Sequence, residues 1–245
     1  MILLDDWSKL FFILYFNRSL SLSSFVDEKH LISALSHKPR RGRPKKQPMD
    51  TLDTRESLLR AGMQVLTETG FVSSSIDPIL RSVGVPKGSF YHYFSSKEAF
   101  GLAVLERYSR YFENKLDKFL LDDAFTPLER LRNFAQDAEN GIIRHDFKRG
   151  CLVGNLEQES ILLSDSFSQR LQEIYVSWQN RVASCLTEGQ KQKEVTREQT
   201  VEVMSQIFWI GWEGAVHRAR LVKSTQPLSA FLGFFIQTVK QEQGK

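Results

Sequence analysis

The chain has 245 residues, of which 41% are hydrophobic and 25% charged, a composition that is typical of globular proteins and excludes a wholly disordered chain. It has two cysteines, Cys151 and Cys185, which excludes a disulfide framework or a cysteine-built zinc site and is compatible with a cytoplasmic protein. We therefore expect a cytoplasmic location, no cofactor and no metal.

The formal net charge of +4 is unevenly distributed along the chain. Residues 1–49 contain nine basic and four acidic residues, a net charge of +5, so the rest of the chain carries −1. Six of the nine bases lie between Lys38 and Lys46 with no acid among them. A basic run this local indicates a local partner.

Residues 1–37 contain one apolar run, Leu10–Phe16, which is too short to cross a bilayer. Asp5 and Asp6 stand where a signal peptide carries positive charge. We interpret residues 1–37 as a poorly ordered extension, with a mis-assigned translation start as a variant of this interpretation. A membrane or export role is the alternative, and we expect no membrane partner.

Residues 38–52 are predicted to form a basic arm. Pro39, Pro44 and Pro48 disfavour a helix, so the segment is expected to stay extended. Such an arm can lie in a narrow A·T-rich minor groove, whose negative potential attracts arginine. The expected contacts come from Arg41, Arg43 and Lys45; the alternative is a tail that only adds solvation.

Residues 53–100 show the pattern of a helix-turn-helix domain. A first helix is expected from Thr54, capped by Asp53 or Thr54 itself and ended by Gly70. A second follows Ser75 and is broken by Gly84, and a third starts at Pro86 after a short turn.

The first residues of that third helix are expected to enter the major groove. Lys87 and Ser89 can bond base edges or phosphates, and Gly88 permits close approach to DNA. Phe90 and Phe94, four residues apart, are expected in the core. The expected DNA contacts in this domain are Ser75, Lys87, Gly88, Ser89, Tyr91, His92, Tyr93 and Lys97.

Lys97 opens the next helix, for which Ser95 and Glu98 are predicted to form a capping box. Its ammonium, added to the positive end of that helix, is expected to hold a DNA phosphate. A purely structural three-helix bundle would explain the apolar pattern, but not a cluster of polar side chains beside a basic arm.

The segment Gly84–Phe94, with Gly70-Phe71 and Ser96-Lys97-Glu98 around it, closely resembles the DNA-binding segment of TetR-family transcriptional regulators. Pro78 and Leu80 depart from the usual family pattern, and both are tolerable in a short helix. The resemblance implies an all-α homodimer that binds a near-palindromic, double-stranded operator. It also implies a small-molecule effector whose binding to the C-terminal domain lowers operator affinity.

Residues 101–245 show neither strand alternation nor a glycine-rich phosphate loop, and are predicted to form a helical ligand-binding and dimerisation domain. Capping boxes are predicted at Thr126 and Thr196. The helices are expected near residues 97–121, 127–145, 151–163, 166–189, 196–223 and 227–242.

Two stretches, Lys148–Glu159 and Phe208–Gly214, resemble an acrylate-responsive subgroup of the family, and related electrophile-sensing members share Gly150-Cys151-Leu152. This resemblance implies an effector that is a small unsaturated or electrophilic carboxylate or carbonyl compound.

Helical spacing nominates residues that line an effector pocket. Cys151, Asn155 and Glu159 share one helical face, and Arg220 or His217 can neutralise a carboxylate. The alternative for the tryptophans is a plain core or a dimer interface. The candidate ligand-binding residues are Cys151, Asn155, Glu159, Trp178, Trp209, Trp212, Glu213 and Arg220.

Cys151 has three interpretations: a small buried hydrophobic residue, a pocket wall, or a reactive thiolate. The third requires a pKa lowered by Arg149 and by a helix N-terminus.

The last two expected helices carry more apolar residues than one face can bury, which predicts a symmetric dimer interface. Dimerisation also fits two recognition helices in successive major grooves about 34 Å apart. The residues concerned are Ile207, Phe208, Ile210, Trp212, Phe231, Phe234, Phe235 and Ile236.

Two other function classes compete with a ligand-responsive repressor. One is an architectural binder of A·T-rich DNA led by the basic arm, in which Lys87 and Tyr93 matter little. The other is an enzyme with Cys151 as nucleophile and His145 or His217 as base, for which the sequence supplies no third group.

Overall fold

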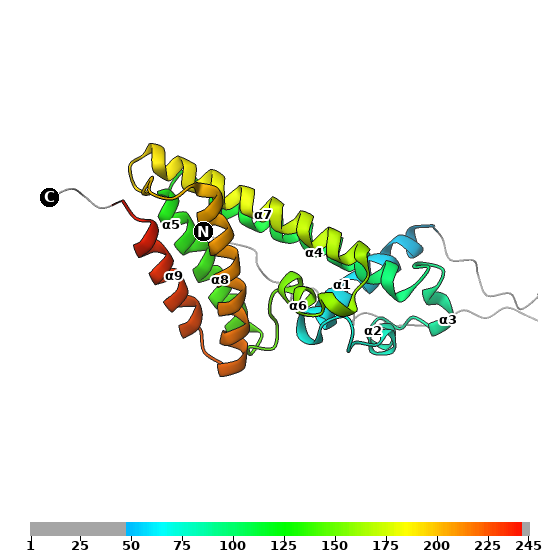
Figure 1. Ribbon diagram of the computed structural model, residues 1–245. Helices are drawn as coiled ribbons and strands as arrows, with labels where there is room; N and C mark the ends of the chain where they lie inside the picture. The colour runs from blue at the N-terminus through cyan, green and yellow to red at the C-terminus, as the bar shows by residue number, and fades with distance from the viewer. Residues whose placement is uncertain (1–47, 242–245) are drawn as a thin grey trace, which may run out of the picture. The chain divides into compact units, whose positions relative to one another are not determined.

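The computed structural model describes residues 48–241, and for residues 48–52 it describes the backbone alone. Within these residues the chain forms helices and a single β-bridge between Val195 and Lys240, so the all-α prediction is confirmed (Figure 1). The helices are α1 Pro48–Thr69, α2 Ile76–Ser82, α3 Lys87–Phe90, α4 Lys97–Leu120, α5 Pro127–Arg144, α6 Leu152–Gln158, the 3₁₀ helix η2 Ser160–Leu162, α7 Asp165–Lys191, α8 Val201–Val222 and α9 Gln226–Val239.

Helix α1 begins at Pro48, earlier than the expected start at Thr54. Residues 48–52 therefore belong to this helix and not to an extended arm. Proline is tolerated in the first turn, where its missing N–H has no intrahelical partner. The helix ends at Gly70 as predicted, with φ +80° and an N–H that donates to the carbonyl of Leu66 at 3.0 Å.

The turn between α2 and α3 forms where the sequence predicts it, with Gly84 at φ +66°. The cap of α4 differs from the prediction by one residue. Ser96, not Ser95, is the N-cap, and its Oγ accepts from the N–H of Ala99 at 2.9 Å. Both serines precede Lys97 and Glu98, so the sequence alone does not distinguish them.

The capping box at Thr126 is present: the Glu129 carboxylate accepts from the backbone N–H of Thr126 at 2.9 Å. The box predicted at Thr196 is wrong, because α8 begins at Val201 with Thr200 as its cap. Thr196 instead donates its N–H to the carbonyl of Val239 at 2.8 Å. Tertiary contact at the end of α9 thus replaces the local cap.

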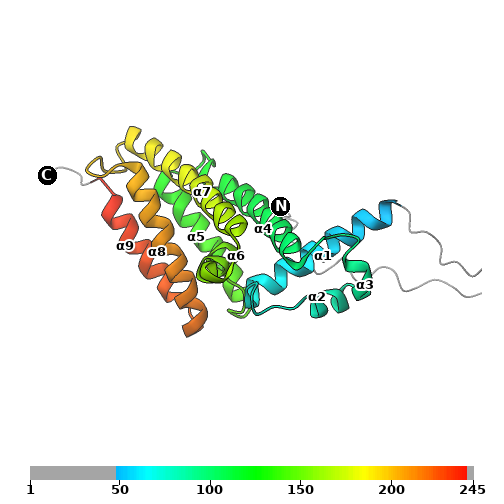
Figure 2. The same cartoon turned by 45° about the vertical axis from the view of Figure 1, so that its right-hand side comes forward.

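Helix α4 connects the N-terminal helices to the rest of the described chain. It packs on α1 at one end and on α5 and α7 along its length, while α7, α8 and α9 lie successively side by side (Figures 1 and 2). One continuous apolar core runs from Leu58 in α1 to Val239 in α9. A shift of α4 would therefore displace its contacts with α1 as well as those with α5 and α7. No helix among the described residues is long and apolar enough to span a bilayer.

Candidate DNA-reading face and sensor core

The inner side of the helix-turn-helix is an aromatic cluster. Phe90, Phe94 and Phe100 are buried, and their ring centroids lie 4.9–5.5 Å apart. The prediction that Phe90 and Phe94 are core residues is confirmed. These rings fix α3 against α4 and thereby orient its other side.

The outer side of the helix-turn-helix carries the residues expected to contact DNA, here called the reading face. A Cβ built at Gly88 would meet no atom within 4 Å, so the backbone is open to close approach. Ser75, Lys87, Gly88, Tyr91 and His92 are exposed, and Ser89 and Tyr93 are half-buried.

Lys87 forms an ion pair with Asp77 of α2, with Nζ 3.1 Å from Oδ1 and 3.2 Å from Oδ2. Both side chains are largely exposed, so the pair is worth at most about 1 kcal/mol. A phosphate or a guanine edge can compete for this ammonium.

The ammonium of Lys97, which the sequence predicts to hold a DNA phosphate, is bound to backbone carbonyls of the protein. It donates to the carbonyls of Phe71 at 2.8 Å and Val72 at 3.4 Å, and lies 4.5 Å from the centre of the Phe71 ring. Burial lowers the pKa of Lys97, and the charge of Glu159 opposes that shift. Lys97 thus has partners within the protein, in the loop between α1 and α2.

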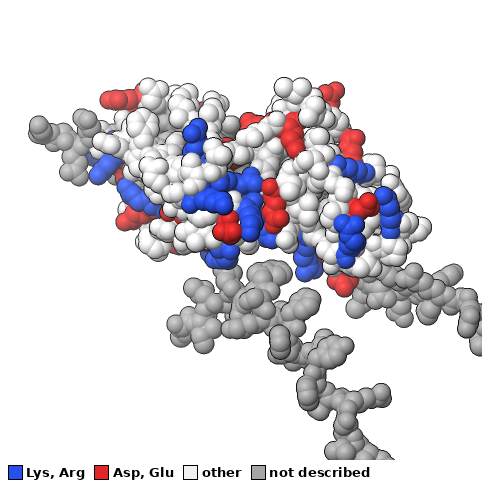
Figure 3. All heavy atoms as spheres, turned by 90° about the horizontal axis from the view of Figure 1, so that it is seen from below, with Lys and Arg blue, Asp and Glu red and all other residues white. Residues whose placement is uncertain are grey.

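Charge on the described residues does not form one continuous basic surface on the face seen in Figure 3. Basic groups there alternate with acidic ones. The dense basic run lies upstream, and its residues Arg41, Arg43 and Lys45 fall outside the described residues.

Glu159 binds the same loop as Lys97, through the backbone N–H groups. Its Oε2 accepts from the N–H of Phe71 at 2.8 Å and of Val72 at 3.1 Å. Glu159 and Lys97 therefore hold the N–H and C=O groups of one dipeptide. The structure brings this candidate ligand-binding residue to the helix-turn-helix instead of to Cys151.

Asn155 and Arg220 form a polar clasp on the C-terminal end of α1. Asn155 Nδ2 donates to the carbonyls of Leu66 at 3.2 Å and Thr67 at 2.9 Å, and its Oδ1 accepts from Arg220 at 3.0 Å. Arg220 also donates to the carbonyl of Glu68 at 2.9 Å. A third bond, to the Lys148 carbonyl at 2.9 Å, ties α8 to the segment before α6.

The clasp occupies the unpaired carbonyls and the negative end of the α1 dipole, where a cation is favourable. Arg220 is consequently engaged with backbone oxygens. The sequence predicts Arg220 or His217 as the partner of an effector carboxylate, and the geometry gives Arg220 a different set of partners.

Two glycines explain the close approach of α6 to α8. A Cβ at Gly150 would lie 2.7 Å from Cδ of Arg220, and one at Gly154 would collide with the Glu213 carboxylate. The Gly-Cys-x-x-Gly-Asn spacing thus lets the start of α6 lie directly against Glu213 and Arg220 of α8.

Cys151 and Glu213 meet in the buried interior below this contact. Tyr108, a residue that the sequence analysis missed, donates its hydroxyl to Sγ of Cys151 at 3.6 Å. Burial, followed by the charge of Glu213, raises the pKa of Cys151 well above its usual value. That direction is opposite to the one that a reactive thiolate requires.

Glu213 is 5% exposed, and neither of its carboxylate oxygens accepts a hydrogen bond from an N–H or O–H group. Burial raises the pKa of Glu213 to about 7; the neighbouring Cys151 thiol opposes this rise and the charge of Glu157 adds to it. His217, one turn later, lies with its Nδ1 2.9 Å from the backbone carbonyl of Glu213. Because a carbonyl only accepts, Nδ1 carries the proton, and the buried Nε2 is an unpartnered acceptor.

The predicted tryptophans lie in an aromatic cluster beside Glu213, where α4, α5, α7 and α8 meet. Trp178 is 4.4 Å from Phe112 and 4.9 Å from Trp209 between ring centres, and Trp212 is 5.3 Å from Phe134. The indole N–H groups of Trp178 and Trp209 are buried without a partner. Cys151, Trp178, Trp209, Trp212 and Glu213 thus form one interior region, here called the sensor core.

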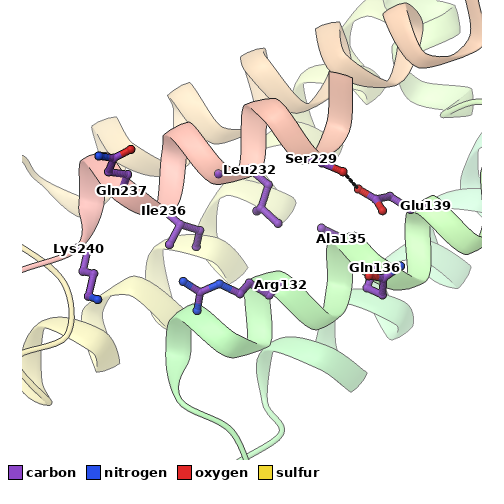
Figure 4. A pocket seen from close by; sticks show the side chains of 10 residues that line it. Arg132, Ala135, Gln136, Glu139, Ser229, Leu232, Ile236, Gln237 and Lys240 are labelled. Atoms are coloured by element: carbon purple, nitrogen blue, oxygen red, sulfur yellow. Dashed lines mark hydrogen bonds between the residues drawn. The ribbon is translucent and has the colours of Figure 1, made fainter. Parts of the chain in front are cut away.

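A hollow of about 500 Å³ lies elsewhere, between α5 and α9 (Figure 4). Arg132 and Lys240 stand at one end, and at the other Ser229 donates to Glu139 at 2.7 Å. None of the candidate ligand-binding residues lines this hollow.

Apolar side chains are also exposed on α8 and α9. The sequence predicts that eight residues there form a dimer interface, and in the structure these residues differ in their exposure. Phe208, Trp212, Phe235 and Ile236 are buried in the protomer, Phe231 is half-buried, and Ile207, Ile210 and Phe234 are 54%, 75% and 71% exposed.

Known protein families match both halves of the chain. Residues 58–104 match the bacterial regulatory proteins of the tetR family, and residues 127–235 match the Tetracyclin repressor-like C-terminal domain.

Curated relatives include the transcriptional regulator AcuR of Cereibacter sphaeroides, 46% identical over 82% of this chain and 92% of AcuR. The transcriptional repressor DhaR of a Mycobacterium species is 33% identical over 73% of this chain and 88% of its own length. The repressor NemR of Escherichia coli is 31% identical over 72% and 88%.

Solved structures give the same result. The regulatory protein TetR from Rhodobacter sphaeroides superposes with a TM-score of 0.74 at 45% identity, covering 76% of this chain and 98% of that one. The reduced form of E. coli NemR superposes with a TM-score of 0.72 at 29% identity, covering 79% and 100%.

Proposed function

Because the chain belongs to the TetR family of bacterial transcriptional regulators, we propose that it is a cytoplasmic homodimeric repressor that a small molecule releases from its operator. The observation that carries this proposal is the clasp of Asn155 and Arg220, which joins α8 of the sensor core to the helix that leads into the reading face.

The reading face binds the major groove, and the basic arm binds the adjacent minor groove or phosphates. Lys87 exchanges its weak pair with Asp77 for a DNA acceptor, and Tyr91 and His92 donate to phosphates. Lys97 and Glu159 contribute indirectly, because they hold the loop that positions α2. The operator is near-palindromic because each protomer supplies one such face.

The effector binds in the sensor core and acts through α6. Gly154 touches Glu213, while the next residue, Asn155, touches both Arg220 and α1. A molecule that moves Glu213 or its neighbours displaces α6 and loosens the clasp. It thereby favours a dimer whose reading faces no longer match the groove spacing.

The effector class is a small unsaturated or electrophilic acid or carbonyl compound. The Gly150–Asn155 segment and the likeness to AcuR and NemR support this class. Burial of Cys151 and the direction of its pKa favour reversible binding beside the thiol over attack by a free thiolate.

A gel shift of the DNA upstream of the protein's own gene, challenged with acrylate and related small acids, tests this function. We expect a discrete complex that one class of compound dissolves. A complex that forms equally on unrelated A·T-rich DNA and ignores every compound would contradict the repressor function.

A further inference from the structure

The hollow between α5 and α9, of about 500 Å³, has the volume of a small-molecule binding site and takes no part in the proposed function. No residue of the sensor core lines it. It also lies apart from the apolar face of α8 and α9, because the exposed Ile207, Ile210 and Phe234 are not among its lining residues. The hollow is therefore distinct from both of these regions.

Two cations stand at one end of the hollow without a counter-charge. Arg132 comes from α5 and Lys240 directly follows α9, so the two side chains approach from opposite walls (Figure 4). Neither side chain has an ion pair or a hydrogen bond with another described residue. A guanidinium fork and a compact ammonium placed together favour an anion between them, and a phosphate suits both.

The other end of the hollow has the opposite charge. The Glu139 carboxylate stands there and accepts from the hydroxyl of Ser229 at 2.7 Å. A second anionic group on a ligand would be repelled from this end. A ligand with one anionic head is therefore oriented, with its head toward Arg132 and Lys240.

The floor between the two ends is apolar. Ala135 and Ile236 are 1% and 5% exposed, and Leu232 is half-buried. Gly233 also lines the hollow, and a Cβ built there would meet no atom within 4 Å. This floor suits a short aliphatic chain, which gains free energy by leaving water.

We propose that the hollow is a second ligand site, which takes a phosphate monoester with a short aliphatic chain. The phosphate lies between Arg132 and Lys240. The chain lies on Ala135, Leu232 and Ile236. A phosphate monoester is favoured over a carboxylate because it carries one charge for each cation. The sensor core is not part of this site, so the assignment does not rest on the proposed function.

Calorimetric titration of the full chain with hexyl phosphate, hexanoate, inorganic phosphate and 1-hexanol tests the assignment. Hexyl phosphate should bind at least about tenfold more tightly than inorganic phosphate, which lacks the chain. It should exceed 1-hexanol, which lacks the charge, by at least about tenfold, with hexanoate between the two.

The charge of each cation is tested by substitution. Arg132→Gln and Lys240→Gln should each weaken hexyl phosphate by about three- to tenfold, since both side chains are exposed and their ion pairs are partly screened. Arg144→Gln, an exposed arginine of the same helix α5 that does not line the hollow, is the matched control and should change nothing.

Gly233→Leu tests the place of binding without removing a charge. The new side chain would occupy the open space beside the floor, and leucine favours a helix more than glycine does, so the protein should fold and lose hexyl phosphate binding. Gly141→Leu is the control: its Cβ position on α5 is equally open, but Gly141 does not line the hollow.

The rival occupant is the segment of residues 242–245, which directly follows the described chain. Its removal should leave the affinity for hexyl phosphate unchanged, and a gain of about tenfold would make this segment the occupant instead. No binding of hexyl phosphate, equal binding of 1-hexanol, or normal binding by Gly233→Leu would also overturn the assignment. None of these measurements uses operator DNA, so such a failure leaves the proposed function standing.

Discussion

Phe90 and Tyr91 are neighbours in the chain with opposite surroundings. Phe90 is fully buried among aromatic rings, while Tyr91 is 58% exposed on the reading face. Fold and DNA binding can therefore be separated by two adjacent substitutions.

Phe90→Ala should lower the free energy of unfolding by about 3–5 kcal/mol, because it removes a ring from a closely packed cluster. Tyr91→Ala should leave unfolding within about 0.5 kcal/mol and weaken operator binding. Urea denaturation and gel shifts measure the two effects. Equal losses of stability in both variants would refute this division.

Glu213 should make stability depend on pH. Its pKa is raised to about 7 in the folded chain, above the ordinary value of 4.5, so the folded state holds a proton that the unfolded state has lost between these values. Stability should fall as the pH rises from about 5 to 7, by about 3 kcal/mol in total, and level off above. Urea denaturation of Glu213→Gln against wild type should show this difference; parallel curves would exclude it.

Sequence patterns predict single residues well where apolar spacing decides the outcome, as at Phe90 and Phe94. They fail where a polar side chain has two chemically sensible partners. Lys97 can hold a phosphate or the Phe71 carbonyl, and Arg220 a carboxylate or a helix end. Local sequence does not contain the distant partner that decides between them. Tyr108 carries no signal at all, since it sits on a regular amphipathic helix.

At the scale of the elements, the short helix α6 contacts α1 on one side and α7 on the other, and its residue Asn155 is part of the clasp. Its partners are the final carbonyls of α1, so the strength of the clasp sets how firmly α1 is coupled to α8. The guanidinium presents its N–H donors in a rigid planar fork that reaches acceptors on three segments, a geometry that the compact ammonium of lysine does not reproduce.

Arg220→Lys should cost about 1–3 kcal/mol of unfolding free energy, because it keeps the charge but leaves carbonyls and Asn155 without donors. It should also weaken operator binding. Arg218→Lys, an exposed neighbour on α8, is the matched control and should change neither. Denaturation and gel shifts provide both readouts; an Arg220→Lys protein that behaves like this control would show that the clasp is dispensable.

The element boundaries illustrate how far local rules reach. Thr126 with Glu129 forms its capping box, but the same pattern at Thr196 does not, because Thr196 binds the end of α9. The sequence does not predict the start of α1 at Pro48, because proline disfavours the interior of a helix but is tolerated in its first turn.

For the whole molecule, the exposed Ile207, Ile210 and Phe234 form the part of the predicted interface that the protomer does not bury. A second copy is the proposed cover for this face.

Ile210→Asp should shift the protein from dimer to monomer, because burying an unpaired carboxylate in that interface is unfavourable. Ile161→Asp, which alters a 96% exposed isoleucine away from this face, is the control. Sedimentation velocity reads the mass of each variant. A dimeric Ile210→Asp protein with normal operator affinity would locate the interface elsewhere.

The proposed role of the basic arm concerns the complex of the whole protein with DNA. Deleting Lys38–Lys46 removes six bases per protomer and should lower the salt dependence of operator binding, by up to about five in the log–log slope per protomer. Gel shifts over a salt series measure this slope. An unchanged slope would show that the arm does not contact DNA.

In the proposed complex, two reading faces of one dimer enter successive major grooves. Methylation interference at guanine N7 on the upstream DNA detects this arrangement. We predict two interfering clusters, one helical turn or a whole multiple of a turn apart (about 34 Å per turn), that disappear together in Lys87→Ala. Interference spread evenly along the DNA, or clusters unaffected by that substitution, would contradict the account.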